Sequence, residues 1–190
     1  GLISAIALQR KGIATVVIER NGYPSHKVCG EYISNEVIPY LKSLDCYPDH
    51  LDIAHIDRFI LSDVQGREAH MTLSQGGFGV SRYVLDQFLA SRAHAEGAEI
   101  MTQTRVESIT WQEDRFVLTL HQGKQLQSPL VIGAYGKRSR LDKQLDRRFT
   151  HAASPYVGVK YHIKTDFAPD AVALHNFDKG YCGLSMVEGN

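Results

Sequence analysis

The chain has 190 residues, enough for one large domain or for one domain and part of another. Hydrophobic residues make up 43% of it, and 21 basic residues balance 21 acidic ones, so it reads as a globular protein without the charge of a nucleic-acid binder. The 3 cysteines lack the spacing of a disulfide framework or a zinc site, and no apolar run reaches roughly 18 residues, the length of a membrane span. A reducing, cytoplasmic setting is the default expectation.

Residues 1–20 predict a helix followed by a buried strand. Apolar residues recur at helical spacing over 2–8, and Gly12 supplies a helix stop. Residues 14–18 are a continuous β-prone run, as in a parallel strand covered on both faces, and Glu19 closes it. This order of helix, short turn, apolar strand and terminal acid is typical of the second half of a dinucleotide-binding βαβ unit.

The first half of such a unit, a strand and a G-x-G-x-x-G turn, does not precede this helix. We interpret Gly1 as the last glycine of that turn, which lets helix and strand pack closely, and Glu19 as the acid that accepts hydrogen bonds from a ribose. We therefore expect the chain to be a fragment trimmed inside the motif. The alternative is an amphipathic helix and strand of any α/β protein.

Residues 31–41 predict a second helix, because apolar residues recur there at helical spacing. Pro39 lies inside this pattern, so we expect the helix to start, kink or restart there. Cys29 and Gly30 come just before it. A small Cys-Gly pair at a helix start leaves backbone N–H groups free and lets a ligand come close.

Residues 27–31, Lys-Val-Cys-Gly-Glu, resemble the K-x-C-G-[DE] segment of the geranylgeranyl reductase group of flavoproteins, within the p-hydroxybenzoate hydroxylase-like superfamily. The resemblance implies that Lys27, Cys29 and Gly30 lie against FAD, near the flavin. Two interpretations of Cys29 stay open. It is either a small buried hydrophobic residue or a redox-active or substrate-facing catalytic group.

Residues 56–62 and 68–73 alternate in polarity on either side of a turn at 63–66. They predict a β-hairpin, an insertion over about residues 50–80 that belongs to a second, antiparallel layer. Such an insertion would cover a substrate site.

A helix with Ser81 as its N-cap follows, and its sequence through Ile100 resembles the S-R-x-x-L-D-x-x-L-x-x-x-A-x-x-x-G-A-x-I pattern of the same superfamily. The resemblance implies that Arg82 approaches the cofactor. A cation at a helix start opposes the helix dipole, and an anionic ligand such as a pyrophosphate would remove that conflict. The alternative is a solvated arginine. The family also places a backbone group near the adenine at the position of Val106, which would be a core residue in any case.

Residues 98–100 begin a strand, and 108–111 with 116–120 predict another hairpin. An apolar strand is then predicted to end at residues 133–136, Gly-Ala-Tyr-Gly, where glycines permit a close backbone approach at the edge where open sheets bind ligands. This resembles the G-A-D-G-x-x-S segment that helps to hold FAD in the same flavoproteins. The matching residues are Gly133, Ala134, Gly136 and Ser139. Tyr135 stands where the family has an aspartate, so the role of that carboxylate is not carried over.

The chain becomes charged and irregular near residue 150, where we place a domain boundary. The expected fold is α/β with α+β insertions: a Rossmann-like FAD-binding domain over 1–150, interleaved with the start of an antiparallel substrate sheet over 151–190. The strands predicted for that incomplete sheet cover 156–163, 171–177 and 181–188.

The function that the resemblance implies is FAD-dependent oxidoreduction, with NAD(P)H or a similar donor reducing the flavin and an apolar, isoprenoid-like small molecule as substrate. Such a substrate would bring the parent protein into peripheral contact with a membrane, and the oligomeric state stays open. The fragment itself is expected to be inactive. The residues assigned to the cofactor are Gly1, Glu19, Arg20, Lys27, Cys29, Gly30, Arg82, Val106, Gly133, Ala134, Gly136 and Ser139.

Two alternatives stay open. A flavin-dependent monooxygenase or halogenase of the same superfamily would share the fold and the cofactor. A cofactor-free Rossmann-like binding module is the alternative from another class, and Tyr135 in place of the aspartate motivates it. The sequence indicates no metal site, and its histidines show no recognisable partner spacing.

Overall fold

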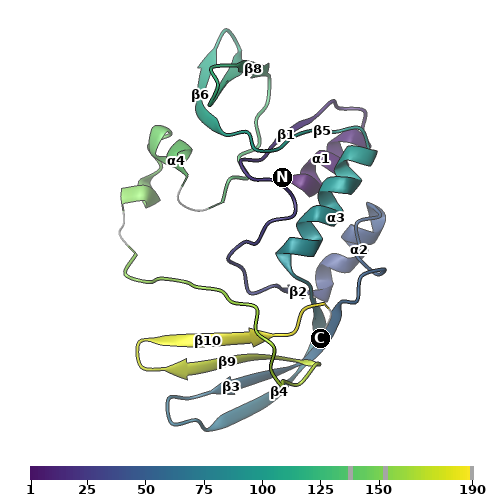
Figure 1. Ribbon diagram of the computed structural model, residues 1–190, viewed down its shortest axis with the longest axis vertical. Coiled ribbons are helices and arrows are strands. Elements are labelled where there is room, and N and C mark those ends of the chain that lie inside the picture. The colour runs from purple at the N-terminus through teal and green to yellow at the C-terminus, as the bar shows by residue number, and fades with distance from the viewer. Residues whose placement is uncertain (137–138, 152–153, 189–190) are drawn as a thin grey trace. The chain divides into compact units, whose positions relative to one another are not determined.

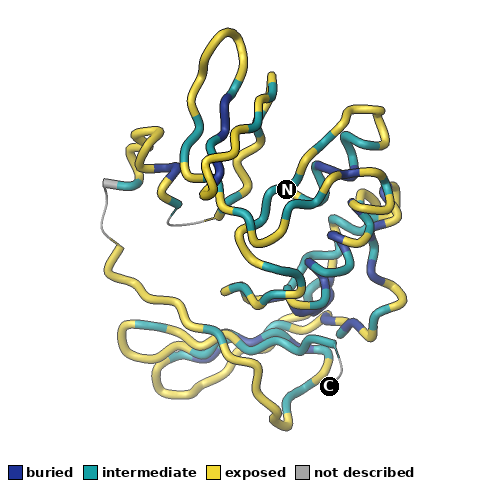
Figure 2. Tube along the Cα trace, turned by 45° about the horizontal axis from the view of Figure 1, so that its top comes forward, coloured by how far each residue is buried: buried dark blue, intermediate teal, exposed yellow. Residues whose placement is uncertain are grey.

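The computed structural model describes residues 1–136, 139–151 and 154–188. The chain is a mixed α/β protein, as predicted, and forms two compact units. Unit 1 comprises residues 1–23 and 90–157, and unit 2 comprises residues 24–89 and 158–190. Figure 1 labels the elements of both units, and Figure 2 shows how far each residue is buried. The predicted division of the chain at residue 150 stays a prediction.

Unit 1 contains the helix and the strand predicted at the start of the chain. The prediction that this strand is covered on both faces is wrong: Val16 is 44% exposed, because the strand belongs to a sheet of only two strands among the described residues. Helix α1 (Leu2–Gln9) ends before Gly12, whose φ of +72° suits a glycine, and strand β1 (Val16–Ile18) follows. Strand β5 (Glu99–Met101) pairs with β1 in parallel, which confirms the strand predicted at 98–100. Since parallel strands need a long crossover connection, this pairing is typical of an α/β unit.

Unit 1 also contains a three-stranded antiparallel sheet in the order β6-β7-β8. The predicted hairpin is confirmed by β6 (Val106–Gln112) and β7 (Arg115–Leu120), and β8 (Gln125–Ser128) extends it. Two short helices follow in sequence, α4 (Arg140–Gln144) and the 3-10 helix η2 (Arg148–His151).

Unit 2 is built on a five-stranded sheet in the order β10-β9-β3-β4-β2. Its strands are β2 (Tyr32–Ser34), β3 (Ala54–Ser62), β4 (Glu68–Gly79), β9 (Ala171–Phe177) and β10 (Gly180–Ser185). Both predicted hairpins, β3-β4 and β9-β10, are confirmed, and β3 pairs with β9 in parallel. Ile60, Ala171 and Ala173 form a buried cluster on one face of this sheet. Helix α3 (Arg82–Ala95), predicted from Ser81, begins in unit 2 and ends in unit 1.

The helix predicted over residues 31–41 is wrong in its first half. Strand β2 pairs with the end of β4, the 3-10 helix η1 (Asn35–Val37) follows, and helix α2 (Ile38–Ser43) begins only there. Pro39 lies in the first turn of α2, where its missing N–H costs nothing. The Cys29-Gly30 pair therefore precedes a strand and not a helix, because pairing with a distant strand overrode the local apolar spacing.

Two predicted strands do not form. The apolar run that leads to 133–136 and the alternating segment 156–163 carry no regular secondary structure. A strand requires a neighbouring ladder, and neither segment pairs with a strand in the part of the chain that the structure describes. Leu130 and Ile132 are accordingly 65% and 52% exposed. The predicted strand over 181–188 ends three residues early, at Ser185.

Candidate functional site

A pocket in unit 1 lies just beyond the carboxyl ends of the parallel strands β1 and β5. Glu19 continues the pairing of these strands, because its N–H donates to the Met101 carbonyl at 2.9 Å and its carbonyl accepts from the Thr104 N–H at 3.0 Å. The pocket is lined by Arg20, Asn21, Gln103, Arg105 and His121. This is the edge at which open α/β sheets bind ligands, and the lining carries two guanidinium groups suited to an anion.

Two of the residues assigned to the cofactor lie next to this lining. The Glu19 carboxylate accepts a hydrogen bond of 3.0 Å from the Asn21 N–H, which turns the acid back along the end of β1. Val106 follows the lining residue Arg105 and opens β6. The structure thus gathers Glu19, Arg20 and Val106 in one region of unit 1.

The Gly-Ala-Tyr-Gly segment passes close to the start of helix α1. A Cβ atom added to Gly1 would lie 3.3 Å from the Cβ of Ala134, so a larger residue at position 1 would push the segment away. Gly136 has a φ of +69°, a conformation that favours glycine, whereas a Cβ on Gly133 would meet only the Tyr135 ring, at 2.9 Å. Gly1 and Ala134, which are far apart in sequence and were both assigned to the cofactor, are therefore brought together.

Tyr135, which replaces the family's aspartate, turns to a partner within unit 1. Its hydroxyl donates to the Asp142 carboxylate at 2.9 Å, and burial together with this hydrogen bond raises the pKa of Tyr135. The Ser139 hydroxyl accepts from the Leu141 N–H at 3.1 Å and caps helix α4. Ser139 thus has a structural partner, and its role toward the cofactor stays a prediction.

A second group of polar residues in unit 2 centres on Glu31, whose side chain is buried and 4% exposed. Its carboxylate accepts from the Arg82 N–H at 2.7 Å, from Lys160 Nζ at 2.6 Å and from His162 Nε2 at 2.8 Å. Burial alone would raise the pKa of Glu31, but the hydrogen bonds from Lys160, Arg82 and His162 outweigh it and hold that pKa below its usual value. The carboxylate is therefore ionised at neutral pH.

Lys27, Cys29 and Arg82, all assigned to the cofactor, lie together around a buried aspartate. The Arg82 guanidinium makes two hydrogen bonds of 2.9 Å to Asp86, which raise the pKa of Arg82, and Lys27 Nζ lies 3.2 Å from the same carboxylate. The Cys29 thiol is a further partner of Arg82. Asp86 thus supplies, from within the chain, the anion that the cation at the start of α3 requires. A Cβ on Gly30 would meet no atom within 4 Å, so the space beside Gly30 is open, and its role toward the cofactor stays a prediction.

The start of helix α3 is capped twice. Ser81 Oγ accepts from the Val84 N–H at 3.2 Å, which confirms the predicted N-cap. The Glu188 carboxylate accepts from the Ser81 N–H at 2.6 Å and also from the Ser81 hydroxyl. Sequence reasoning missed Glu188, as it missed Asp86, Lys160 and His162. Lys160 and His162 are two residues apart in a segment with alternating polarity, and this spacing could have indicated that their side chains share one face.

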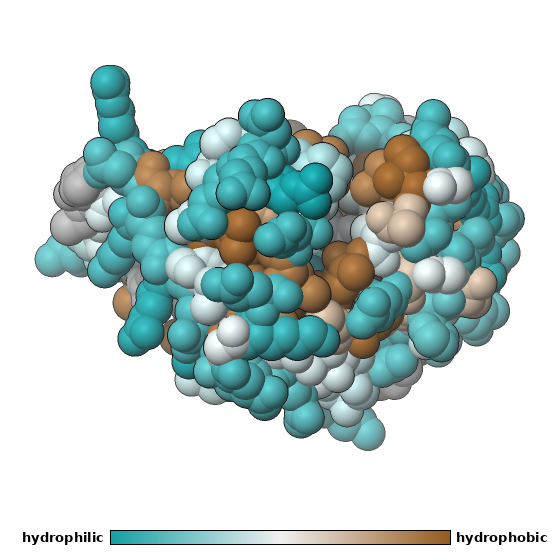
Figure 3. Space-filling view, turned by 90° about the horizontal axis from the view of Figure 1, so that it is seen from above, coloured by the Kyte–Doolittle hydropathy of each residue, from teal (hydrophilic) through white to brown (hydrophobic). Residues whose placement is uncertain are grey.

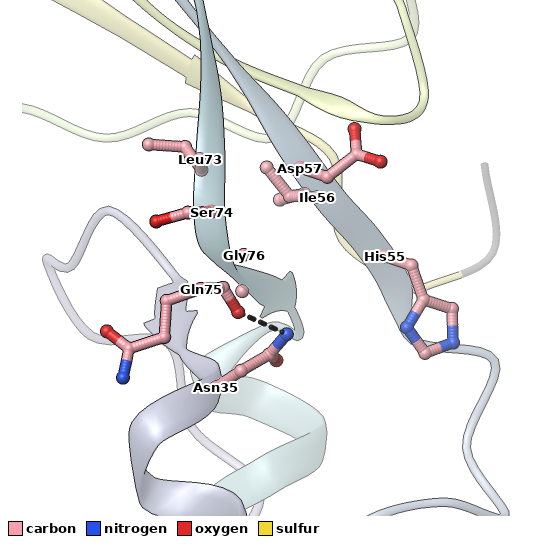
Figure 4. A pocket seen from close by; sticks show the side chains of 9 residues that line it. Asn35, His55, Ile56, Asp57, Leu73, Ser74, Gln75 and Gly76 are labelled. Atoms are coloured by element: carbon pink, nitrogen blue, oxygen red, sulfur yellow. Dashed lines mark hydrogen bonds between the residues drawn. The ribbon is translucent and has the colours of Figure 1, made fainter.

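A further pocket in unit 2 surrounds an irregularity in the β3-β4 ladder (Figure 4). The register passes from Ile56 opposite Gly77 to Arg58 opposite Thr72, so residues 73–76 bulge out opposite Asp57. Figure 4 shows the Asn35 side chain reaching the Gln75 carbonyl across this bulge, a hydrogen bond of 3.0 Å. None of the residues that the sequence analysis assigned to the cofactor or to catalysis lines this pocket.

The described residues contain no group of three His, Cys, Asp or Glu side chains placed to share a metal ion. Within the same residues, no helix has both the length and the apolar character needed to cross a bilayer.

A prediction follows from the lowered pKa of Glu31. A carboxyl group that ionises more readily when folded stabilises the protein above its usual pKa of 4.5, and this contribution is lost as the pH falls through the lowered value. We expect Glu31→Gln to lower the melting temperature of the complete protein at neutral pH and to change it progressively less toward about pH 3. The exposed Glu36→Gln is the control. A melting difference for Glu31→Gln that is constant across this range would contradict the prediction.

Comparisons with known proteins place the chain among flavoproteins. The sequence profile of the FAD binding domain family matches residues 1–174. Protein FixC of Salmonella typhi is 28% identical over 182 residues, which cover 86% of this chain and 41% of that protein. The digeranylgeranylglycerophospholipid reductase of Methanosarcina mazei is 27% identical over 160 residues, 75% of this chain and 37% of that enzyme.

The fold is shared with solved structures. A flavoprotein/dehydrogenase from Cytophaga hutchinsonii superposes with a TM-score of 0.66 at 16% identity, over 92% of this chain and 47% of that one. The chain spans about two fifths of the length of the curated relatives, 41% of FixC and 37% of the reductase.

Proposed function

The chain belongs to the FAD binding domain family, and from this premise we propose that its complete protein is an FAD-dependent oxidoreductase resembling geranylgeranyl reductases. The observation that carries the proposal is the pocket of unit 1, which places Arg20 and Arg105 at the carboxyl ends of two parallel strands, beside Glu19. In this proposal FAD is reduced by NAD(P)H or a similar donor, and the substrate is an apolar small molecule.

The residues of unit 1 fit this cofactor. In the proposal Glu19 holds a ribose through hydrogen bonds, and Arg20 and Arg105 face the phosphate-bearing side of the nucleotide. Gly1 and Ala134, where an added Cβ on Gly1 would lie a tight 3.3 Å from the Ala134 Cβ, keep the backbone near the ligand in this proposal. The cofactor supplies the hydride and electron transfer when bound, and the chain supplies binding, orientation and electrostatics.

Unit 2 is proposed to supply the residues nearest the reaction, with Lys27, Cys29, Gly30 and Arg82 toward the flavin and Cys29 as the catalytic candidate. Val28, which is 74% exposed, presents an apolar side chain beside Cys29 that could contact an apolar ligand. The 27% identity to an enzyme that is named a reductase of a digeranylgeranyl lipid supports the same class of substrate.

The test is the visible spectrum of the complete protein, purified from cells and then mixed anaerobically with NADPH or NADH. Two flavin bands that the nicotinamide bleaches, and that an isoprenoid alkene restores, are expected. Restoration only by O₂, with hydroxylation of an aromatic substrate, would favour the monooxygenase alternative instead. A colourless protein that takes up no added FAD would overturn the proposal and leave a binding module.

Cys29 is tested separately. The Cys29→Ser variant is expected to retain its FAD content, because the thiol contacts Arg82 and Glu31 without carrying the ion pairs of the site, and to lose turnover. Stopped-flow measurement of flavin reduction and reoxidation locates the affected step. Cys182→Ser, at an exposed position in β10, is the matched control. Unchanged turnover in Cys29→Ser would make Cys29 a structural residue.

A further inference from the structure

Segment 158–163 has two different faces. Lys160 and His162 both point to the Glu31 carboxylate, at 2.6 and 2.8 Å, and the His26 ring meets the edge of His162 with 5.2 Å between centroids. The alternate residues are Val159, Tyr161 and Ile163, exposed by 70%, 77% and 64%. Such alternation is typical of an extended chain, yet the segment pairs with no strand among the described residues. Side chains, and not a ladder, therefore hold it in unit 2.

Glu31 has an unusual backbone for a residue in this position. Its φ is +60°, a left-handed conformation that non-glycine residues adopt rarely, although Gly30 stands immediately before it. A residue held in such a backbone conformation is a reason to look for a function of its side chain. Here the Glu31 N–H faces the Cys29 sulfur at 3.5 Å while the carboxylate reaches Lys160 and His162, so one residue joins the cysteine loop to the distant segment.

The charges around this residue give the contact its strength. Lys27 and Arg82 share Asp86, so the third cation of the group, Lys160, has Glu31 as its partner. Removing the Glu31 charge would take away the carboxylate that Lys160 Nζ meets at 2.6 Å. Since the pair is buried on the Glu31 side, water would not replace that carboxylate fully.

We propose that Glu31 is a positioning residue whose carboxylate docks segment 158–163 beside Cys29. The sequence assigned residues 27–31 and Arg82 to one site. Through the contacts with Glu31, Lys160 and His162 join that site. All of these contacts lie within unit 2, so the proposal does not depend on the cofactor.

The test is limited proteolysis of the complete protein with chymotrypsin, which cleaves after exposed tyrosines. The rate at Tyr161 is compared with that at Tyr181, which is 66% exposed but lies in strand β10. Glu31→Gln is expected to raise cleavage at Tyr161 by about tenfold or more and to leave Tyr181 unchanged, because proteolysis follows the population of the released segment. Glu36→Gln is expected to change neither rate. Equal acceleration at both tyrosines, or none at Tyr161, would overturn the proposal.

A double-mutant cycle separates direct docking from a general effect on folding. The Lys160→Gln/His162→Gln pair is expected to accelerate cleavage at Tyr161 in the natural sequence and to add nothing in the Glu31→Gln background. Lys164→Gln, at an exposed lysine immediately after the segment, is the control. Additive effects would overturn the proposal. Should Glu31→Gln fail to fold, the Lys160→Gln/His162→Gln pair must still release Tyr161, and its failure to do so would equally overturn it.

Discussion

A Gly79→Ala variant of the complete protein is expected to melt well below the unsubstituted protein. Gly79 ends strand β4, and an added Cβ atom would collide with the carbonyl oxygen of Met186 and lie 3.0 Å from its carbonyl carbon. These are backbone atoms, which cannot turn aside as the end of a flexible side chain does. Forcing a group into such a site costs about 1–3 kcal/mol or more, equivalent to a fall of roughly 2–12 °C in melting temperature for a domain of about 150–250 residues.

The same Gly79→Ala substitution should also disturb the capping of helix α3. Gly79 lies two residues before Ser81, and Met186 two residues before Glu188, the pair that caps helix α3. Displacing one segment from the other should therefore weaken the cap as well. Calorimetry of Gly79→Ala against Gly22→Ala, where an added Cβ meets no atom within 4 Å, measures the effect. Equal melting temperatures for the two variants would show that the two segments separate without cost.

Removing both arginines of the unit 1 pocket is expected to lower FAD affinity about a hundredfold. A hydrogen bond to a charged group contributes about 1.5–3 kcal/mol, and each 1.4 kcal/mol is about tenfold in affinity. The Arg105 side chain is 58% exposed, so solvent screening places each single substitution near the lower end, at about tenfold.

Titration of the apoprotein with FAD, followed by flavin fluorescence, compares Arg20→Ala, Arg105→Ala and the double variant. Arg115→Ala is the matched control, because Arg115 is an exposed arginine of unit 1 on strand β7. A double variant that binds FAD within about threefold of the unsubstituted protein would remove this pocket from the cofactor site.

Many large apolar side chains of the chain are exposed to solvent. Figure 3 shows apolar residues among hydrophilic ones on one face of the molecule. In unit 2 the exposed apolar side chains include Val28, Val159, Tyr161 and Ile163. Because Val28 precedes Cys29 and the others alternate with Lys160 and His162, the docking of segment 158–163 would decide which way this apolar surface faces.

Elements that depend on neighbours in the chain could be predicted from the sequence. Helix α1 with strand β1, the hairpins β3-β4, β6-β7 and β9-β10, and the Ser81 cap all follow from periodicity, turn residues and capping over a few positions. The cofactor motifs could be recognised for the same reason, since glycines and an acid at fixed spacing act through local backbone geometry. The proximity of Gly1 and Ala134, by contrast, was not predicted, although the resemblance assigned both residues to the cofactor.

Features that depend on partners far along the chain could be seen only once the chain was folded. Strand β2 formed because Gly77–Gly79 lay beside it, whereas segment 156–163 remained irregular for want of a strand partner among the described residues. The Arg82, Lys160 and His162 groups that donate to Glu31 are 51, 129 and 131 residues away in sequence, and no local pattern around Glu31 predicts them. A buried carboxylate needs donors, but the sequence does not say which donors the fold will bring, because that choice is made by the packing of the whole unit.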